Sequence, residues 1–454
     1  MTQKQISILY VAQWSMFSDG KFLCGTDYPS LALNNFIQMF GKDKKTNYSI
    51  TVIVPEGITI NDIIFDKYKK LISNNELLIN LNNDVKVTTI QHKWFSNLLI
   101  NRYNFVFSWY SEVLTSGKYD IILNLIPEIA RNIKSVLKVN NLNSKIITWN
   151  NWVDIPSESV FNDTTTNYFF RQVDGVYSSD LYLFASESNQ RSFEKGVKEN
   201  IKSPLPNTLD WIPTAYFKQY SDFLIDKKDL SIEEINSLEP IKYSPNEVVI
   251  FAERISSTGY TNHEMILNAF SNPYLTKYML LVMNPSKMKG LDLIQQSFPD
   301  WKFDEVKLKF NNFSDGKYQI VEAVKHANAY IILSQLSHDD FLKISNYANA
   351  SISYRFKEKY GSSTIRETAF AGNCLPVVPQ VNEYAKWYKD NGYYIKKSMK
   401  NQEKNLLSAV DTLMSLDQIH RKKLLNEVKA NMLTSCSLDH DEKRVMSLFK
   451  SVIK

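Results

Sequence analysis

A short segment in the second half of the chain places hydroxyl and acidic side chains at the expected start of a helix. It reads GSSTIRETAFAGNCLPVVP, from Gly361 to Pro379. Ser362, Ser363 and Thr364 are residue types that cap helix N-termini, where the backbone amides bind anions such as phosphate. Glu367 follows in the first turn and could accept hydrogen bonds from two sugar hydroxyls of a nucleotide. A structural interpretation stays open, because Thr364 and Glu367 also fit the S/T-x-x-E capping box.

Basic residues near this carboxylate could neutralise a diphosphate. Arg366 directly precedes Glu367. The strand and loop before the helix carry Arg355, Lys357 and Lys359. Cationic side chains make strong, charge-assisted hydrogen bonds to phosphate oxygens. Each of the four could equally be a solvated surface residue.

A second group of candidate residues lies in the first half, in the segment IITWNNWVDIPSES. It follows a predicted strand, so it should lie at the strand's carboxyl end. Asp154 could take the proton of an acceptor hydroxyl or orient that hydroxyl. Trp149 and Trp152 could stack on a sugar or a base. Buried tryptophans beside a loop aspartate would produce the same pattern without any chemistry.

The elements that must position these residues alternate between short apolar runs and longer amphipathic runs. The predicted strands are Ile6–Ala12, Ser49–Val54, Val85–Thr89, Ile121–Leu125, Lys145–Trp149, Leu181–Phe184, Val248–Ala252, Tyr278–Met283, Ala329–Leu333, Ser351–Tyr354, Leu375–Val378 and Tyr393–Ile395. The predicted helices are Pro29–Phe40, Ile60–Asn74, Pro127–Val139, Glu187–Lys195, His263–Ser271, Gly290–Phe298, Lys317–His326, Asp339–Tyr347, Ser363–Ala371, Gln402–Leu416, Asp417–Met432 and His440–Val452. This order predicts an α/β protein with parallel, doubly wound sheets, which bind ligands at the carboxyl ends of their strands.

The length of the chain predicts more than one domain. Its 454 residues exceed the roughly 250–300 residues at which a single core stops growing. The alternation lapses between Lys202 and Asn246, in a stretch rich in Pro, Ser, Asp and Lys. We therefore predict one domain over 1–208, a connection over 209–245 and a second domain over 246–437. A terminal helix over 438–454 could pack back on the first domain.

The composition excludes several classes of protein. Hydrophobic residues make up 44% of the chain and charged residues 22%, with a net charge of +5, as in an ordinary globular protein with a mildly basic surface. Cys24, Cys374 and Cys436 form no CxxC or Cys/His cluster, so we expect neither a zinc site nor a disulfide framework. No apolar run is long enough to span a membrane and no signal peptide is evident, so we expect a cytoplasmic protein.

Two motifs resemble those of retaining glycosyltransferases with the GT-B fold. RETAFAGNCLPVV is similar to the E-x-A-x-A-x-G-x-P-V-V signature, whose glutamate holds the donor ribose and matches Glu367. VVIFAERISSTGYTNHEMILNAF is similar to the GR-x-x-x-x-KG segment, with Arg254 at the diphosphate arginine and Gly259 at the helix start. The layout is most similar to phage DNA α-glucosyltransferases over about the last 200 residues.

The resemblance implies two Rossmann-like doubly wound domains facing a central cleft, with an acceptor-side N-terminal domain and a nucleotide-sugar-binding C-terminal domain. It implies UDP-glucose as donor, transfer with retention, no required cofactor or metal, and hydroxymethylated bases of double-stranded DNA as acceptor. Gly25 and Thr26 stand nearest to the N-terminal glycine loop of the family. The sequence departs from the family at Thr258, where a lysine is usual, and at Lys359, where an acid is usual.

Other functions remain open. The lysine clusters Gly41–Asn47, Lys67–Lys70, Ile395–Lys404 and Arg421–Lys423 could follow a phosphate backbone, or they could be solvated lysines. A bacterial transferase that builds surface polysaccharide, teichoic acid or glycolipid is one alternative, with His92–Leu114 as a candidate membrane-surface segment. A nucleotide-binding protein that keeps the fold without turnover is another. The oligomeric state is not predicted.

Overall fold

The computed structural model describes most of the chain. The described residues are 4–14, 28–64, 71–73, 76–80, 84–92, 107–151, 153, 165–213, 215–237, 239–253, 255, 261–283, 288–313, 317–334, 336–355, 362–381, 383–389, 392–396 and 401–453. They form two compact units, one of residues 1–215 with 440–454, and one of residues 216–439. We call these the first and the second unit. Our sequence-based boundaries were 208 and 437.

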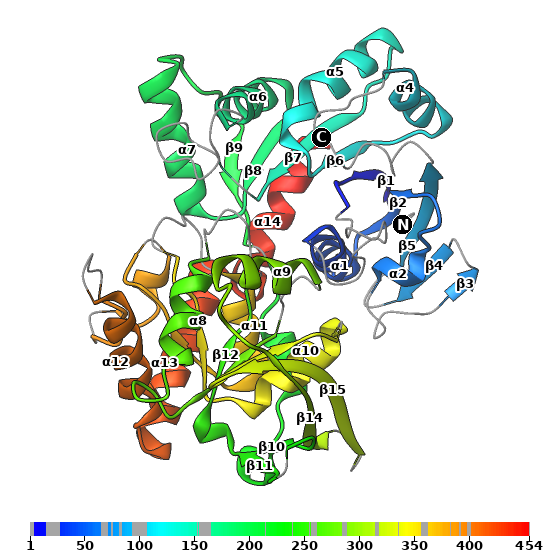
Figure 1. Ribbon diagram of the computed structural model, residues 1–454. Coiled ribbons are helices and arrows are strands. Elements are labelled where there is room, and N and C mark those ends of the chain that lie inside the picture. The colour runs from blue at the N-terminus through cyan, green and yellow to red at the C-terminus, as the bar shows by residue number, and fades with distance from the viewer. Residues whose placement is uncertain are drawn as a thin grey trace. The chain divides into compact units, whose positions relative to one another are not determined.

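The first unit is built on a nine-stranded sheet in the order β3-β4-β5-β2-β1-β6-β7-β8-β9 (Figure 1). Its strands are β1 Lys4–Val11, β2 Thr46–Pro55, β3 Leu71–Ser73, β4 Glu76–Asn80, β5 Asp84–His92, β6 Ile121–Asn124, β7 Lys145–Asn150, β8 Leu181–Phe184 and β9 Leu209–Trp211. The strands from β5 to β9 pair in parallel, and β3 and β4 pair antiparallel at one edge. Strands β6 and β8 are buried along their whole length, as expected of parallel strands covered on both faces.

Helices connect these strands. They are α1 Tyr28–Gly41, α2 Ile60–Ile63, α4 Phe107–Ser116, the 3-10 turn η2 Pro127–Ile129, α5 Ala130–Val139, α6 Thr165–Ser178 and α7 Glu187–Asn200. The terminal helix α14, Leu438–Val452, also belongs to this unit apart from its first two residues. Phe449 of α14 packs on Phe36 and Phe40 of α1, with ring centroids 5.7 and 5.6 Å apart. Lys450 pairs with Asp43 at 2.9 Å, so apolar and ionic contacts both hold α14 in place.

The second unit has a nine-stranded sheet in the order β11-β10-β14-β15-β16-β13-β12-β17-β18. Its strands are β10 Ser231–Glu234, β11 Ile241–Tyr243, β12 Val248–Phe251, β13 Met279–Val282, β14 Asp304–Phe313, β15 Lys317–His326, β16 Ala329–Ile332, β17 Ala350–Ile352 and β18 Leu375–Val377. The five strands from β16 to β18 pair in parallel. The other four extend the sheet as an antiparallel ribbon.

The helices of the second unit cover its parallel strands. They are η4 Lys218–Phe223, η5 Lys227–Asp229, η6 Pro245–Glu247, α8 His263–Ser271, α9 Met288–Ser297, α10 His338–Ile344, η7 Ser345–Tyr347, α11 Ser363–Gly372, η8 Tyr384–Lys386, α12 Gln402–Met414 and α13 Gln418–Cys436. Helix α13 begins after Asp417, whose carboxylate accepts from the backbone amides of Ile419 and His420. This cap satisfies two of the amides that a helix start leaves without partners.

Three sequence-based assignments were wrong. Residues 317–326 form strand β15 rather than a helix, because Val321 and Ala323 are buried while Ile320 and Glu322 are exposed, a period of two. The helix expected from Ile60 ends at Ile63, and 71–73 form a strand. Residues 393–395 form only an isolated bridge between Pro379 and Ile395.

The stretch that we predicted as a connection is largely integrated into the second unit. It supplies β10, β11 and two 3-10 turns, and Asn346 binds its backbone at Phe223 and Ile225. The Lys227 ammonium donates to the carbonyl of Ala348 and to Oδ1 of Asn349 at 3.0 Å. Burial lowers the pKa of Lys227 to about 8, although part of its side chain reaches the surface.

The shifted pKa of Lys227 predicts a pH-dependent stability. Above pH 8 the folded protein releases this proton, while the unfolded chain keeps it up to about pH 10.4. The unfolded state therefore binds more protons in that window, and this group makes the free energy of unfolding rise with pH. Urea unfolding should be measured between pH 7.5 and 9.5. Over this range the free energy of unfolding of Lys227→Met should rise less with pH, or fall more steeply, than that of the wild type. The exposed neighbour Lys228→Met serves as the control; equal slopes in all three proteins would contradict the prediction.

Candidate functional site

The strand order of the second unit identifies one edge of its sheet as the place for a ligand. Strands β12 and β17 are neighbours, and each continues to its next parallel strand on the opposite side, β13 and β18 respectively. The chain therefore leaves the carboxyl ends of β12 and β17 in opposite directions. Such a switch point is where open α/β sheets bind ligands. Helices α8 and α11 begin after these two strands.

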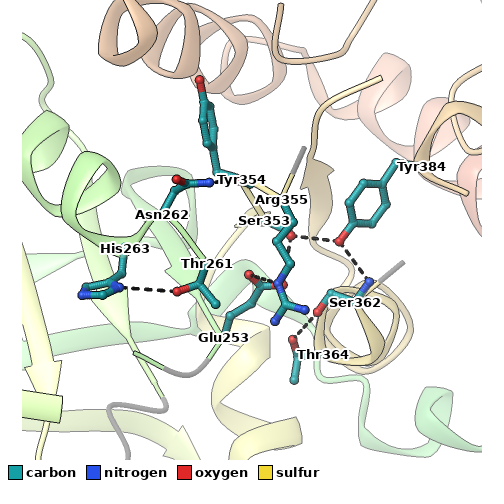
Figure 2. Close-up of polar contacts among 10 residues, drawn as sticks. All are labelled: Glu253, Thr261, Asn262, His263, Ser353, Tyr354, Arg355, Ser362, Thr364 and Tyr384. Carbon is teal, nitrogen blue, oxygen red and sulfur yellow. Dashed lines mark hydrogen bonds and ion pairs between the residues drawn. The ribbon is translucent and has the colours of Figure 1, made fainter. Parts of the chain in front are cut away.

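A chain of hydrogen bonds connects the residues at this switch point (Figure 2). The backbone amide of Ser362 donates to the hydroxyl of Tyr384 at 3.0 Å. That hydroxyl lies 2.9 Å from Oγ of Ser353, and Ser353 Oγ donates to Oε1 of Glu253 at 2.9 Å. Nε of Arg355 donates to Oε2 of the same carboxylate at 2.8 Å. The start of α11 is thus tied to residues that follow β12 and β17.

Glu253 is the anionic centre of this network. It is 1% exposed, and its two oxygens accept from different donors, one neutral and one cationic. A buried carboxylate is tolerated only when hydrogen bonds and a countercharge replace its hydration. Arg355, whose side chain is 12% exposed, supplies that countercharge. Figure 2 shows Arg355 reaching from the end of β17 toward Glu253.

The first turn of α11 differs from a capping box. The helix begins at Ser363 with Ser362 as the N-cap residue, so Thr364 already lies inside the helix. The hydroxyls of Ser362 and Thr364 bind each other at 2.8 Å, and Ser362 makes no side-chain cap bond. The Thr364–Glu367 capping box therefore does not explain Glu367.

Glu367 is enclosed beside a histidine that the sequence did not single out. It is 3% exposed, and its Oε2 lies 3.6 Å from Nε2 of His338, the first residue of α10. The His338 ring meets Tyr220 edge-on at 5.9 Å between centroids. The imidazole of His338, itself packed against Tyr220, thus limits where the Glu367 carboxylate can point.

Arg366 lies in a different environment from Arg355. It is 2% exposed, and its Nη1 lies 3.3 Å from Oε1 of Glu383, which is 3% exposed. Its guanidinium also lies over the ring of Phe217 at 5.2 Å. Burial, followed by the Glu383 carboxylate, raises the pKa of Cys436 to about 12, so this neighbouring thiol stays protonated. This placement favours a structural ion pair for Arg366 over the diphosphate contact that we expected.

Helix α8 contributes a further group of polar residues that sequence reasoning missed. Its N-cap residue Asn262 has a left-handed backbone, with φ of 51°, and donates to the carbonyl of Tyr354 at 2.6 Å. The buried His263 lies 3.4 Å from Oγ1 of Thr261. Burial lowers the pKa of His263, which favours the neutral imidazole. The only signal in the sequence was the polar triplet at a predicted helix start.

The remaining predicted site residues divide into two groups. Gly25, Thr26, Trp152, Asp154, Arg254, Gly259 and Lys359 lie outside the described residues. Trp149 is described, is 1% exposed, and packs against Tyr28 and Phe36 with ring centroids 5.5 and 5.1 Å apart. Its placement favours a role in the core of the first unit over stacking on an acceptor.

Neither a metal cluster nor a membrane-spanning helix is found in the described part of the chain. No group of three or more His, Cys, Asp or Glu side chains there could hold a metal ion. Among the same residues, every helix is too short or too polar to cross a bilayer.

Known proteins resemble this chain in structure. Comparison with protein-family models and with curated proteins finds no match. An α-glucosyltransferase in complex with UDP-glucose and abasic DNA is 12% identical, with a TM-score of 0.58 and 100% of both chains covered. A UDP-forming α,α-trehalose-phosphate synthase from Burkholderia xenovorans is 10% identical, with a TM-score of 0.59 and 100% of both chains covered. An E. coli trehalose-6-phosphate structure with bound UDP-2-fluoro glucose is 10% identical, with a TM-score of 0.58 and 99% of both chains covered.

At these identities the likeness establishes the fold. The chain has the GT-B fold, with two α/β units of Rossmann-like type.

The Arg366–Glu383 pair predicts a loss of stability without a specific loss of ligand binding. Arg366→Ala should lower the free energy of unfolding by about 3–5 kcal/mol, because it leaves the buried Glu383 carboxylate without this cation. Urea unfolding measures this, and the double change Arg366→Met with Glu383→Leu should recover most of the loss. A stable Arg366→Ala protein with weakened nucleotide binding would show that the arginine acts on a ligand instead.

Proposed function

We propose that this chain is a glycosyltransferase that moves a sugar from a nucleotide-sugar donor to an acceptor hydroxyl. The observation that carries the proposal is the enclosed Glu367 carboxylate, on the fifth residue of α11, a helix that starts at the switch point. A carboxylate there can accept from both hydroxyls of a ribose, while helix-start amides and a cation beside it can bind phosphate. The GT-B fold supports the same reading.

The donor is proposed to be UDP-glucose. Glu367 would accept from the ribose hydroxyls, while the amides of Ser363 and Thr364 and the Arg355 guanidinium would bind the diphosphate. Two of the similar structures contain UDP-glucose or its 2-fluoro analogue, which favours a uridine nucleotide. Among the residues outside the described part, Arg254 is proposed to share the diphosphate charge, with Gly259, Gly25, Thr26 and Lys359 near the donor.

Transfer is proposed to proceed with retention and without a protein nucleophile. The bond between the sugar C1 and the diphosphate oxygen breaks as C1 bonds to the acceptor oxygen on the same face. The acceptor proton passes to the departing phosphate, and Asp154 would orient the acceptor hydroxyl. The protein's contribution is then to stabilise the charge that develops on the leaving group. No metal is required by this scheme.

The acceptor is proposed to be a hydroxymethylated base in double-stranded DNA. The similarity to an α-glucosyltransferase bound to DNA supports this choice. Exposed lysines at Lys42, Lys44, Lys45, Lys422 and Lys423 could contact the phosphate backbone. A free sugar phosphate is a second candidate, because a trehalose-phosphate synthase is also similar over the whole chain.

The role of Glu367 predicts a binding defect. Glu367→Ala should weaken the affinity for UDP by roughly 10- to 100-fold, since hydrogen bonds to charged groups are worth about 1.5–3 kcal/mol. Isothermal titration calorimetry with UDP measures this, and thermal melting checks the fold. The exposed Glu427→Ala on α13 is the control. Unchanged affinity of Glu367→Ala for UDP would rule out the ribose contact.

The acceptor proposal predicts transfer of labelled glucose to one substrate class. Incubation with UDP-glucose should label duplex DNA that contains hydroxymethylcytosine and leave unmodified duplex unlabelled. Binding to this DNA should weaken as salt rises, because phosphate contacts release counterions. Labelling of glucose 6-phosphate alone would replace the DNA acceptor with the sugar-phosphate alternative.

A further inference from the structure

The hydrogen-bond chain at the switch point joins residues from four separate elements of the second unit. Ser362 is the N-cap of α11, Tyr384 lies in η8, Ser353 follows β17 and Glu253 follows β12. We infer that Tyr384 is a positioning residue, which holds the α11 start and Arg355 in the arrangement that binds the diphosphate of the donor. This inference rests on the proposed function and adds a residue that touches no substrate itself.

The donor and acceptor of each hydrogen bond can be assigned from the two ends of the hydrogen-bond chain, the Glu253 carboxylate and the Ser362 amide. A carboxylate accepts only, so Ser353 donates its proton to Glu253. Ser353 can then only accept from Tyr384, across 2.9 Å. Tyr384 in turn accepts from the backbone amide of Ser362. All donors therefore point toward Glu253, and such aligned hydrogen bonds strengthen one another in a low-dielectric interior.

Tyr384 is itself rigidly held. It is 1% exposed, and its ring packs edge-on against Trp387 with centroids 4.7 Å apart. The hydroxyl of Tyr394 donates to the backbone carbonyls of Tyr384 and Ala385, which fixes the turn that carries the ring. The residue before Tyr384 is Glu383, which pairs with Arg366 of α11. Turn η8 therefore contacts α11 both at its N-cap and one turn further on.

The hydrogen-bond chain ends near groups that could bind an anion, namely the first amides of α11 and the Arg355 guanidinium. The amides of Ser363 and Thr364 are the first of α11, and first-turn amides have no acceptor within their helix. Their direction depends on where the N-cap residue Ser362 is held. At the other end of the chain, Glu253 engages Nε of Arg355 and so sets the plane of the guanidinium. One tyrosine hydroxyl thus couples the helix amides to the cation that would face the same diphosphate.

The chain offers a matched control for the Tyr384 hydroxyl. Tyr388 is also 1% exposed, and its hydroxyl donates to the carbonyl of Pro376 at 2.5 Å. Tyr388→Phe and Tyr384→Phe therefore each remove a buried hydroxyl from the same unit. Only Tyr384→Phe cuts the link to Ser362 and Ser353. A general loss of stability should affect both variants, while a loss of positioning should affect one.

The first experiment uses hydrogen–deuterium exchange of the full-length protein without ligand. In Tyr384→Phe the amide of Ser362 loses its acceptor, so exchange in the peptide that covers the start of α11 should become faster. The same peptide in Tyr388→Phe should exchange as in the wild type. Equal exchange of this peptide in Tyr384→Phe and the wild type would overturn the inference.

The second experiment titrates the same proteins with UDP by calorimetry. Tyr384→Phe should bind UDP about 10-fold more weakly than the wild type, and Tyr388→Phe should bind as the wild type does. Ser353→Ala should weaken UDP binding in the same way. The double variant should lose less binding free energy than the sum of the two single losses, because both changes break the same hydrogen-bond chain. Wild-type affinity in Tyr384→Phe, or an equal loss in Tyr388→Phe, would contradict a positioning role.

The two experiments separate the inference from the function on which it rests. A wild-type protein that binds no uridine nucleotide would end the proposal of UDP-glucose as donor, and the exchange comparison would still decide whether Tyr384 holds the α11 start. If Tyr384→Phe shows faster exchange together with wild-type UDP affinity, the hydrogen-bond chain has only a structural role. That result overturns the inference and leaves the proposed function standing.

Discussion

The arrangement of the second unit must compensate for the burial of one carboxylate, that of Glu253, away from water. A buried carboxylate must receive hydrogen bonds and a countercharge, or its burial would cost several kcal/mol. Both come from the segment after β17, through Ser353 and Arg355. This requirement is met only because β12 and β17 are neighbours, so that the residues after both strands meet at one edge. The strand order and the polar network therefore support each other.

Close packing around α11 keeps that edge in place. A Cβ at Gly372, the last residue of α11, would lie 2.4 Å from the carbonyl oxygen of Ser345 in η7. Only glycine allows this close approach of helix α11 to the turn η7. Cys374 follows two residues later, with its thiol buried against the carbonyls of Ser345 and Ala348. Packing at the far end of α11 thus fixes the helix whose first turn faces the switch point.

The sequence predicted those parts of the molecule whose pattern is local. Helix α8 was predicted with its observed limits, and strands β12 and β13 were found because each is a short, fully buried apolar run. Strand β15 was mistaken for a helix because Ile320, Val321 and Val324 are spaced as on a helix face as well as in a strand. Its antiparallel partners are β14 and β16, and only these pairings distinguish the two. Glu253 and Tyr384 escaped notice for the same reason, since nothing near either residue in sequence indicates the partner that it meets.

The neighbouring charges Arg366 and Glu367 show how one helix turn can serve both fold and ligand. Successive residues of an α-helix point about 100° apart, because 3.6 residues complete a turn. Arg366 therefore faces Glu383 and Phe217, while Glu367 faces His338. A cation beside a carboxylate in sequence suggested a shared ligand, but the helix separates them. The buried ion pair anchors the first turn from one side, and this anchoring leaves the carboxylate on the other side in a fixed direction for recognition.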